Sequence, residues 1–258
     1  MPVSELTHND SVRMAIDAGV APIELRYIPI ITCDTGKPIA YLTRALVHST
    51  VLGNLNESDY LYVSDNLDCS VTLLQHNLQR VIYGISELVR AESEILFVAL
   101  HCPDALVETA DLYTILKEML DKYPAVDPHM ICLVFSTSLL RRDPEKAKQA
   151  IMDLKVLKVR TAITDCCDDK FIPAKLLQVS PDVAFLSPTA TAWAGSRDKP
   201  LLLPSLVSYV KSMCPEVVAV GTPEQRKSMR SSECIGFLEL DAPELLLKEA
   251  VAQKEDDA

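Results

Sequence analysis

Short apolar runs alternate along the chain with longer stretches whose apolar residues recur every three or four positions. The short runs are typical of β-strands, and several are apolar throughout, as expected of strands that are covered on both faces. Eight strands are predicted, at residues 25–31, 39–47, 95–100, 130–135, 159–163, 183–186, 217–220 and 235–238. The chain therefore has a strand-rich core with helical segments between the strands.

The longer stretches predict helices with one buried face. The apolar periodicity predicts helices over 74–89 and 112–119, and two further helices over 200–213 and 243–251. Asp143, Pro144 and Glu145 together are typical of a helix start, because they supply a cap, a first-turn proline and a first-turn acid. Ala147, Ala150, Ile151 and Leu154 then form the predicted buried stripe of that helix.

Eight strands separated by helices in 258 residues predict an α/β fold of the TIM (β/α)8 barrel type. A doubly wound open sheet is the competing fold. It is disfavoured because the chain has only seven glycines and no glycine-rich loop after any predicted strand. No linker or repeat divides the chain, so we expect a single domain over 1–258. The polar stretch 49–68 is predicted to be a connection on the barrel rim.

Composition narrows the classes of partner. The net charge is −11 and no cluster of lysine and arginine stands out, which disfavours binding to nucleic acid or anionic lipid. The N-terminus lacks a signal-peptide pattern and no apolar run is long enough to span a bilayer, so we expect a soluble, cytoplasmic protein. The eight cysteines include no C-x-x-C pair, which favours reduced thiols over a zinc site or disulfides.

In their order and spacing, the segments resemble the bacterial EAL-domain family of cyclic di-GMP phosphodiesterases, from about residue 24 to about residue 243. LRYIPIITCDTGKPIAYLTRALVHS is similar to the family's Y-Q-P-I-V strand, T-G-K turn and E-A-L-x-R strand. LFVALHCPDAL, ICLVFSTSLL and LKVRTAITDCCDDKF resemble the stretches carrying N-x-S-P, E-x-T-E and D-D-F-G-T-G, and VSPDVAFLS, EVVAVGTPEQ and ECIGFLELDAP resemble the last three family strands. The resemblance implies a modified barrel whose first strand is antiparallel, with a short N-terminal extension and an acidic C-terminal tail outside it.

The resemblance also implies a site at the C-terminal strand ends, where two divalent metals and a water cleave a phosphodiester. Most family ligands are replaced at the matching positions. Arg44 stands for the glutamate of E-A-L (Leu42 in an ungapped match), and Leu100, Val134, Thr137, Thr164, Phe185, Val220 and Ile235 replace further site residues. Only Asp165 keeps its carboxylate. Because Mg²⁺ and Mn²⁺ need hard oxygen ligands, the sequence predicts no metal, no cofactor and no phosphodiesterase activity.

Four polar residues remain as candidates for a vestigial ligand pocket: Arg44, His48, His101 and Asp165. The apolar Leu100, Val134, Phe185 and Val220 are predicted to line the same pocket. Charged phosphates against such a wall lack compensation, so the sequence disfavours cyclic di-GMP binding.

The leading functional hypothesis is a non-catalytic regulator that acts through contact with a protein partner or as a homodimer. Its candidate interaction surface is Leu245, Leu246, Leu247 and Val251, because three consecutive leucines cannot all face inward on one helix. One alternative is a degenerate receptor for cyclic di-GMP or another small ligand. The other is an enzyme with new chemistry around His101, Asp165 and Cys166, although the run 165–169 reads more simply as a solvated loop.

Overall fold

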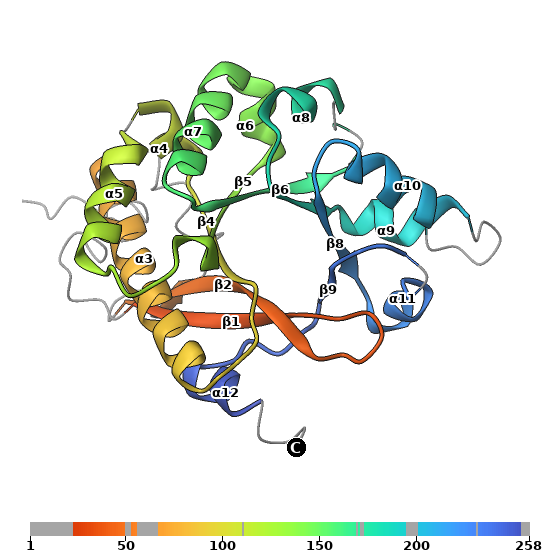
Figure 1. The fold of residues 1–258 in the computed structure, drawn as a ribbon, viewed down its shortest axis with the longest axis horizontal. Coiled ribbons are helices and arrows are strands. Elements are labelled where there is room, and N and C mark those ends of the chain that lie inside the picture. Colours follow the sequence, from red (N-terminus) through yellow and green to blue (C-terminus); the bar gives the residue numbers. More distant parts are fainter. Residues whose placement is uncertain are drawn as a thin grey trace, which may run out of the picture.

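A closed barrel of eight strands surrounded by helices forms the body of the molecule (Figure 1). The computed structural model describes residues 23–49, 53–55, 67–109, 111–168, 170, 173–194, 201–230 and 232–253. The predicted N-terminal extension, the acidic tail and most of the rim stretch 49–68 lie outside these ranges. The barrel strands are β1 (Ile23–Ile31), β2 (Pro38–Ser49), β4 (Phe97–His101), β5 (Ile131–Phe135), β6 (Arg160–Cys166), β7 (Val183–Leu186), β8 (Glu216–Gly221) and β9 (Gly236–Glu239). The predicted barrel is thereby confirmed.

Strand β1 runs against both of its neighbours, and the other barrel strands are parallel to one another. The sheet order is β1-β9-β8-β7-β6-β5-β4-β2-β3, and pairing between β1 and β2 closes the ring. The short strand β3 (Gly53–Leu55) extends β2 beyond the barrel and falls within the stretch predicted to be a connection. The first strand is therefore antiparallel, as the resemblance implied.

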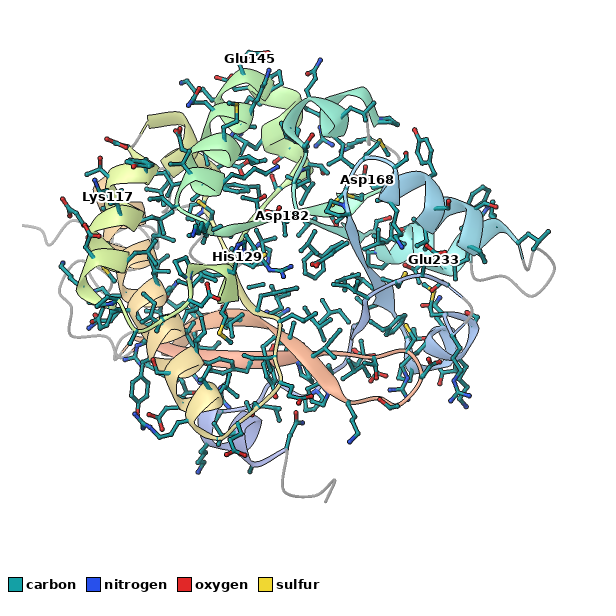
Figure 2. The ribbon with its side chains drawn as sticks, in the orientation of Figure 1. Lys117, His129, Glu145, Asp168, Asp182 and Glu233 are labelled. Atoms are coloured by element: carbon teal, nitrogen blue, oxygen red, sulfur yellow. The ribbon has the colours of Figure 1, made fainter. Side chains whose placement is uncertain are left out.

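Side chains on successive strand residues point alternately into the barrel and out toward the helices. The inward set forms a small apolar core of its own: Ile28, Ile30, Ala40, Phe97, Ala99, Cys132, Val134, Ala162, Val183, Phe185, Val218, Val220 and Leu238. A larger cluster lies between the strands and the helices. The barrel interior is thus packed with side chains, as Figure 2 shows.

Polar contacts hold the end of the barrel at which the parallel strands begin. Arg160 Nη1 donates to Glu216 Oε2 at 2.5 Å, and its guanidinium carbon lies 5.6 Å from the centre of the Phe97 ring. The backbone N–H and the hydroxyl of Thr161 both donate to Asp182 Oδ2 at 2.8 Å. Figure 2 labels Asp182 in this region. The strand starts are therefore tied together, and the strand ends remain for a site.

Ten helices are described: α3 (Leu67–Arg90), α4 (Asp104–Thr109), α5 (Leu112–Lys122), α6 (Thr137–Arg142), α7 (Pro144–Val156), α8 (Pro173–Val179), α9 (Pro188–Ala194), α10 (Leu202–Lys211), α11 (Pro223–Ser228) and α12 (Leu247–Ala252). The predicted start of α7 is confirmed, because Asp143 accepts a hydrogen bond from the Lys146 N–H at 3.1 Å. Within the described ranges, no helix combines the length and apolarity needed to cross a bilayer.

The last predicted helix begins later than expected. Residues 243–246 are not helical; instead Leu245 bridges Tyr27 on β1, with backbone hydrogen bonds of 2.8 and 2.9 Å. Leu246 caps α12, and Leu247, Val251 and Leu245 pack half-buried against the outer core. The premise that three leucines share one helix was wrong, because a long-range backbone pairing holds the first of them. Their role as an interaction surface stays a prediction without that motive.

Helix α3 packs unusually close to β1 at Gly84. A Cβ atom at this glycine would lie 2.1 Å from the Tyr27 hydroxyl and 3.0 Å from Tyr27 Cζ. Tyr27 itself is fixed, because it is buried and its ring makes an edge-on contact with Tyr41 at 5.9 Å. The contact sets how near the longest helix lies to the strand pair that closes the barrel.

Substitution of Gly84→Ala should lower the free energy of unfolding by about 1–3 kcal/mol, despite the usual helix-propensity gain of about 1 kcal/mol. The reason is the clash with Tyr27, so the double variant Gly84→Ala with Tyr27→Phe should recover part of the loss relative to Tyr27→Phe alone. Urea unfolding measures all four proteins. A single variant as stable as the wild type would show that α3 does not pack in this way.

Candidate functional site at the barrel mouth

The C-terminal ends of the parallel strands meet at one end of the barrel, here called the mouth. Directly beneath it the inner core is apolar, and Val134, Phe185 and Val220 are all buried there, as predicted. Leu100 was wrongly assigned to this lining. It lies in the outer cluster beside the helices, because a shift of one residue along a strand exchanges the two faces.

Two arginines lie on the mouth face of the strand pair β1–β2. Ile28 and Leu42 are paired and both contact the inner core, so the next residues on that face toward the mouth are Arg26 and Arg44. Arg26 and Arg44 are direct partners in the antiparallel register. Because β1 is antiparallel, its early residues come to the same end of the barrel as the late residues of β2.

Carboxylates contact both arginines. Arg44 Nη1 forms an ion pair with Glu244 Oε1, and Glu244 precedes the residue that bridges Tyr27. Arg26 Nη2 lies 2.5 Å from Glu24 Oε1. That second contact is close in distance but lacks hydrogen-bond geometry, since Arg26 Nε and Glu24 Oε1 are buried without a hydrogen-bond partner in the described chain. Both arginines are therefore paired with a negative charge, but Arg26 still has an N–H donor and Glu24 an acceptor oxygen without a hydrogen-bond partner among the described residues.

The predicted histidines, His48 and His101, lie on the same side of the mouth as the two arginines, here called the arginine sector. His48 Nδ1 is 2.6 Å from Asn54 Oδ1, and His48 Nε2 is 3.7 Å from Glu24 Oε2. On β4, Ala99 is the register partner of Leu42, so His101 follows on the inner face in the layer of Arg44. The structure thus brings Arg44, His48 and His101 to one side of the mouth.

Asp165 lies apart from this sector, two strands beyond β4 in the sheet order. Its side chain is exposed and its φ is 56°, in the left-handed region. The β6–β7 register shifts between Ile163 and Cys166, so Asp165 sits on a bulge at the end of β6. The matched aspartate is therefore present at the mouth end but is not close in the sheet to the other candidates.

Three residues of this sector were missed from the sequence: Glu24, Arg26 and Glu244. Glu24 and Arg26 had a detectable signal, because they alternate with the apolar Ile23, Leu25 and Tyr27 at the period of a strand. Glu244 had none, since only a long-range backbone pairing brings it to Arg44.

The side chains at the mouth do not fit a two-metal centre. Nowhere in the ranges that the structure describes do three His, Cys, Asp or Glu side chains gather as metal ligands. The inner ends of β5, β7 and β8 present Val134, Phe185 and Val220, which offer no oxygen to a hard cation.

The cysteines near the mouth are poor nucleophiles. Cys166 is fully buried in the outer cluster, away from His101, and burial raises the pKa of its thiol well above the ordinary value. Burial also raises the pKa of Cys167 to about 11. A thiol held neutral reacts slowly, which argues against Cys166 as the centre of a new enzyme site.

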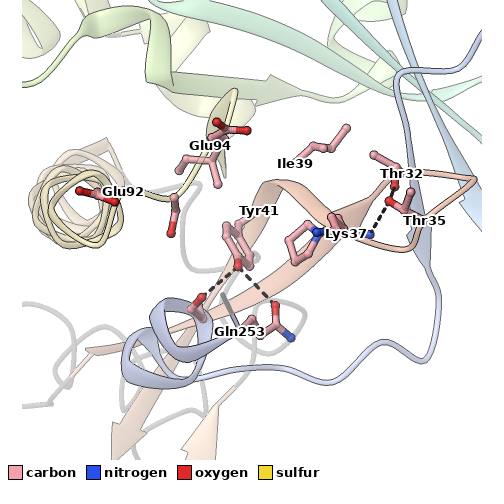
Figure 3. Close-up of a pocket in the computed structure, with 12 residues that line it drawn as sticks. Thr32, Thr35, Lys37, Ile39, Tyr41, Glu92, Glu94 and Gln253 are labelled. Carbon is pink, nitrogen blue, oxygen red and sulfur yellow. Dashed lines mark hydrogen bonds between the residues drawn. The ribbon is translucent and has the colours of Figure 1, made fainter. Parts of the chain in front are cut away.

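A cavity of about 550 Å³ lies at the opposite end of the barrel (Figure 3). Its walls come from the turn before β2 and the segment before β4, and include Lys37, Tyr41, Glu92 and Gln253. Tyr41 donates a hydrogen bond to the Ala250 carbonyl at 3.1 Å, and burial raises its pKa to about 12. This cavity is at the strand starts and is separate from the mouth.

The comparisons with known proteins agree with the fold. The model of the EAL domain matches residues 9–237, and no curated protein matches the chain. The PaMucR phosphodiesterase in complex with c-di-GMP is 14% identical with a TM-score of 0.80, covering 95% of this chain and 100% of that one. The FimX EAL domain from Pseudomonas aeruginosa bound to c-di-GMP is 13% identical with a TM-score of 0.75, covering 93% and 98%. An EAL domain protein from Listeria monocytogenes is 17% identical with a TM-score of 0.72, covering 100% of both chains.

The prediction that cyclic di-GMP is an unlikely ligand was wrong. Barrels of this shape have been solved in complex with that nucleotide. The physical reason for the error is that the apolar inner layer forms only the floor of the mouth. The rim above that layer carries basic and polar side chains, among them the overlooked Arg26.

Alkylation of the native protein at pH 8 should distinguish the adjacent cysteines. Cys167, whose side chain is half-buried, should be labelled slowly by iodoacetamide because the reagent can reach its sulfur, whereas Cys166 should be protected because its side chain is fully buried. Peptide mass spectrometry measures both sites, and urea-unfolded protein, in which both react, is the control. Faster labelling of Cys166 than of Cys167 would contradict its placement and revive the thiol-enzyme hypothesis.

Proposed function

The chain belongs to the EAL domain family, and from that premise we propose that it binds a cyclic dinucleotide at the barrel mouth without hydrolysing it. The observation that supports the proposal is that acidic residues of the family motif are replaced at the mouth by a basic residue and by apolar ones. Arg44 stands on β2 where the family motif has a glutamate, and apolar side chains stand at the inner ends of β5, β7 and β8.

The absence of hydrolysis is supported by the chemistry of two-metal catalysis. Two cations that activate a water and stabilise the leaving oxygen need several carboxylates around them. At the matched positions, Val134 and Val220 are buried apolar residues, and Asp165 is exposed on a bulge. Replacement of a glutamate by Arg44 also adds a positive charge that repels a cation.

Retained binding is supported by the polar rim. A cyclic dinucleotide carries two phosphodiester anions, and arginine binds such groups through two parallel hydrogen bonds. Arg26 and Arg44 are neighbours across one strand pair, and His101 lies in the layer of Arg44. The EAL domains that resemble this chain in fold include several solved with c-di-GMP, which makes it the first ligand to test.

Titration calorimetry with cyclic di-GMP should show binding that survives addition of EDTA, because arginines rather than metals hold the phosphates. Chromatography of the same nucleotide after incubation with Mg²⁺ or Mn²⁺ should show no linear product. Absence of heat at millimolar nucleotide would refute the receptor, and appearance of linear dinucleotide would refute the loss of catalysis. The two halves of the proposal therefore fail separately.

A second candidate function is regulation by contact with a protein, favoured by large apolar side chains on neighbouring helices. Trp193 on α9 is 61% exposed, Tyr209 on α10 is 48% exposed and Leu201, just before α10, is 78% exposed. Single exposed apolar residues are ordinary, but three on two consecutive helices and the residue before one of them mark the exposed sides of α9 and α10 as a candidate contact patch. This surface replaces the terminal leucines as the place to look for a partner or a second copy.

Replacement of Trp193→Ser should abolish any self-association or partner capture seen with the wild type, because it removes the largest exposed apolar side chain of that patch. Val156→Ser is the matched control, since Val156 is 71% exposed on α7, a different helix. Analytical ultracentrifugation and affinity capture measure the effect. Equal loss in both variants, or loss in neither, would contradict a contact at α9 and α10.

A further inference from the structure

Two positive side chains lie directly opposite each other at the mouth. Arg26 and Arg44 are Cα partners in the β1–β2 register and lie on the same face of the strand pair. Like charges directly opposite each other across two strands destabilise a sheet unless an anion compensates them. A negatively charged group close to the two arginines is therefore needed to stabilise this part of the rim.

Two carboxylates supply this negative charge, and they come from different parts of the chain. Glu24 belongs to β1 itself, two residues from Arg26, and so is part of the barrel wall. Glu244 comes from the segment between β9 and α12 and reaches Arg44 across β1. This second ion pair is solvent-accessible, with 44% of the Arg44 and 33% of the Glu244 side chain exposed. Exposed ion pairs are weak, so another anion can replace Glu244 on Arg44.

The compensation is also incomplete in hydrogen bonds. Arg26 Nε and Glu24 Oε1 are buried, and neither has a hydrogen-bond partner in the part of the chain that the structure describes. A guanidinium carries five N–H donors in a rigid planar fork, and a buried donor left without an acceptor is costly. An oxyanion with several acceptor oxygens satisfies such a donor better than a misaligned carboxylate.

We propose that Arg26 and Arg44 form a phosphate-binding subsite in which the Glu244 carboxylate acts as an internal stand-in for the ligand's anion. The ligand class is a phosphodiester or diphosphate, and in the cyclic dinucleotide it is one of the two phosphodiester groups. On binding, the phosphate takes the place of Glu244 on Arg44 and its charge is also compensated by the neighbouring Arg26 guanidinium. The inference deepens the proposed function and, for cyclic di-GMP as the ligand, rests on it.

Glu244 then sets the affinity of the subsite. As long as its carboxylate lies on Arg44, an incoming phosphate competes with it and is repelled by its charge. Neutralising Glu244 removes the competitor and leaves the arginines in place. The chain offers a matched exposed pair for comparison on helix α3, where Arg90 Nη1 lies 2.5 Å from Glu87 Oε1.

The test is titration calorimetry of the full chain with cyclic di-GMP and, separately, with inorganic pyrophosphate. Arg44→Gln and Arg26→Gln should each weaken binding about tenfold or more, the loss expected for a charge-assisted hydrogen bond. Glu244→Gln should tighten binding about two- to fivefold, the effect of releasing an exposed ion pair. Arg90→Gln and Glu87→Gln should leave both affinities unchanged.

The outcomes separate the two proposals. If the wild type binds cyclic di-GMP but the arginine variants bind it equally well, the subsite is wrong and the receptor stands. If cyclic di-GMP does not bind but pyrophosphate binds and is lost in Arg44→Gln, the receptor is wrong and the subsite stands. Binding of neither probe refutes both. Should Arg44→Gln fail to fold, Arg44→Lys keeps the charge without the planar fork and should still weaken binding; unchanged affinity would refute the subsite.

Discussion

The antiparallel pairing of β1 with β2 is the constraint on which the structure of the mouth depends. It closes the barrel, and it reverses the first strand so that residues at its start lie beside residues at the end of β2. A parallel first strand would place Glu24 and Arg26 at the other end of the barrel. The position of the charged rim therefore follows from the direction of a single strand.

The mouth of the barrel has two layers of side chains, an inner layer inside the barrel and a rim at its edge. The inner layer is apolar and excludes charge, because Val134, Phe185 and Val220 leave no oxygen donors. The rim carries charged side chains, which are stabilised there by contact with solvent and by ion pairs with one another. In a two-metal enzyme the acids would descend into the inner layer. At the described part of the mouth the charged side chains lie on the rim above the apolar layer, which suits the binding of an anion better than the activation of water.

Much of the fold could be predicted because it depends on local patterns. All eight barrel strands were found, since each is a short and mainly apolar run, and α7 was found from its cap at Asp143. Strand β3 was missed because its three residues lie in a polar stretch and pair only with the far end of β2. The start of α12 was misplaced because the backbone of Leu245 pairs with Tyr27, more than two hundred positions away.

The site could be predicted only in part, for the same reason. Arg44, His48 and His101 follow from position along single strands, and they share a sector of the mouth. The assignment of Leu100 to the inner layer failed because the spacing of apolar residues does not fix the alignment of a strand to within one residue. An error of one residue moves a side chain from the inner face of the barrel to the outer face. Glu244 was not predicted because its contact with Arg44 exists only in three dimensions.

Under the proposed function, the mouth of this barrel holds an anionic ligand and not a pair of divalent cations. Electron paramagnetic resonance of the purified chain with Mn²⁺, recorded with and without cyclic di-GMP, tests it most directly. We predict the spectrum of free Mn²⁺ in both samples, since no three His, Cys, Asp or Glu side chains gather as metal ligands among the described residues. A spectrum of two coupled, protein-bound Mn²⁺ ions would contradict the account.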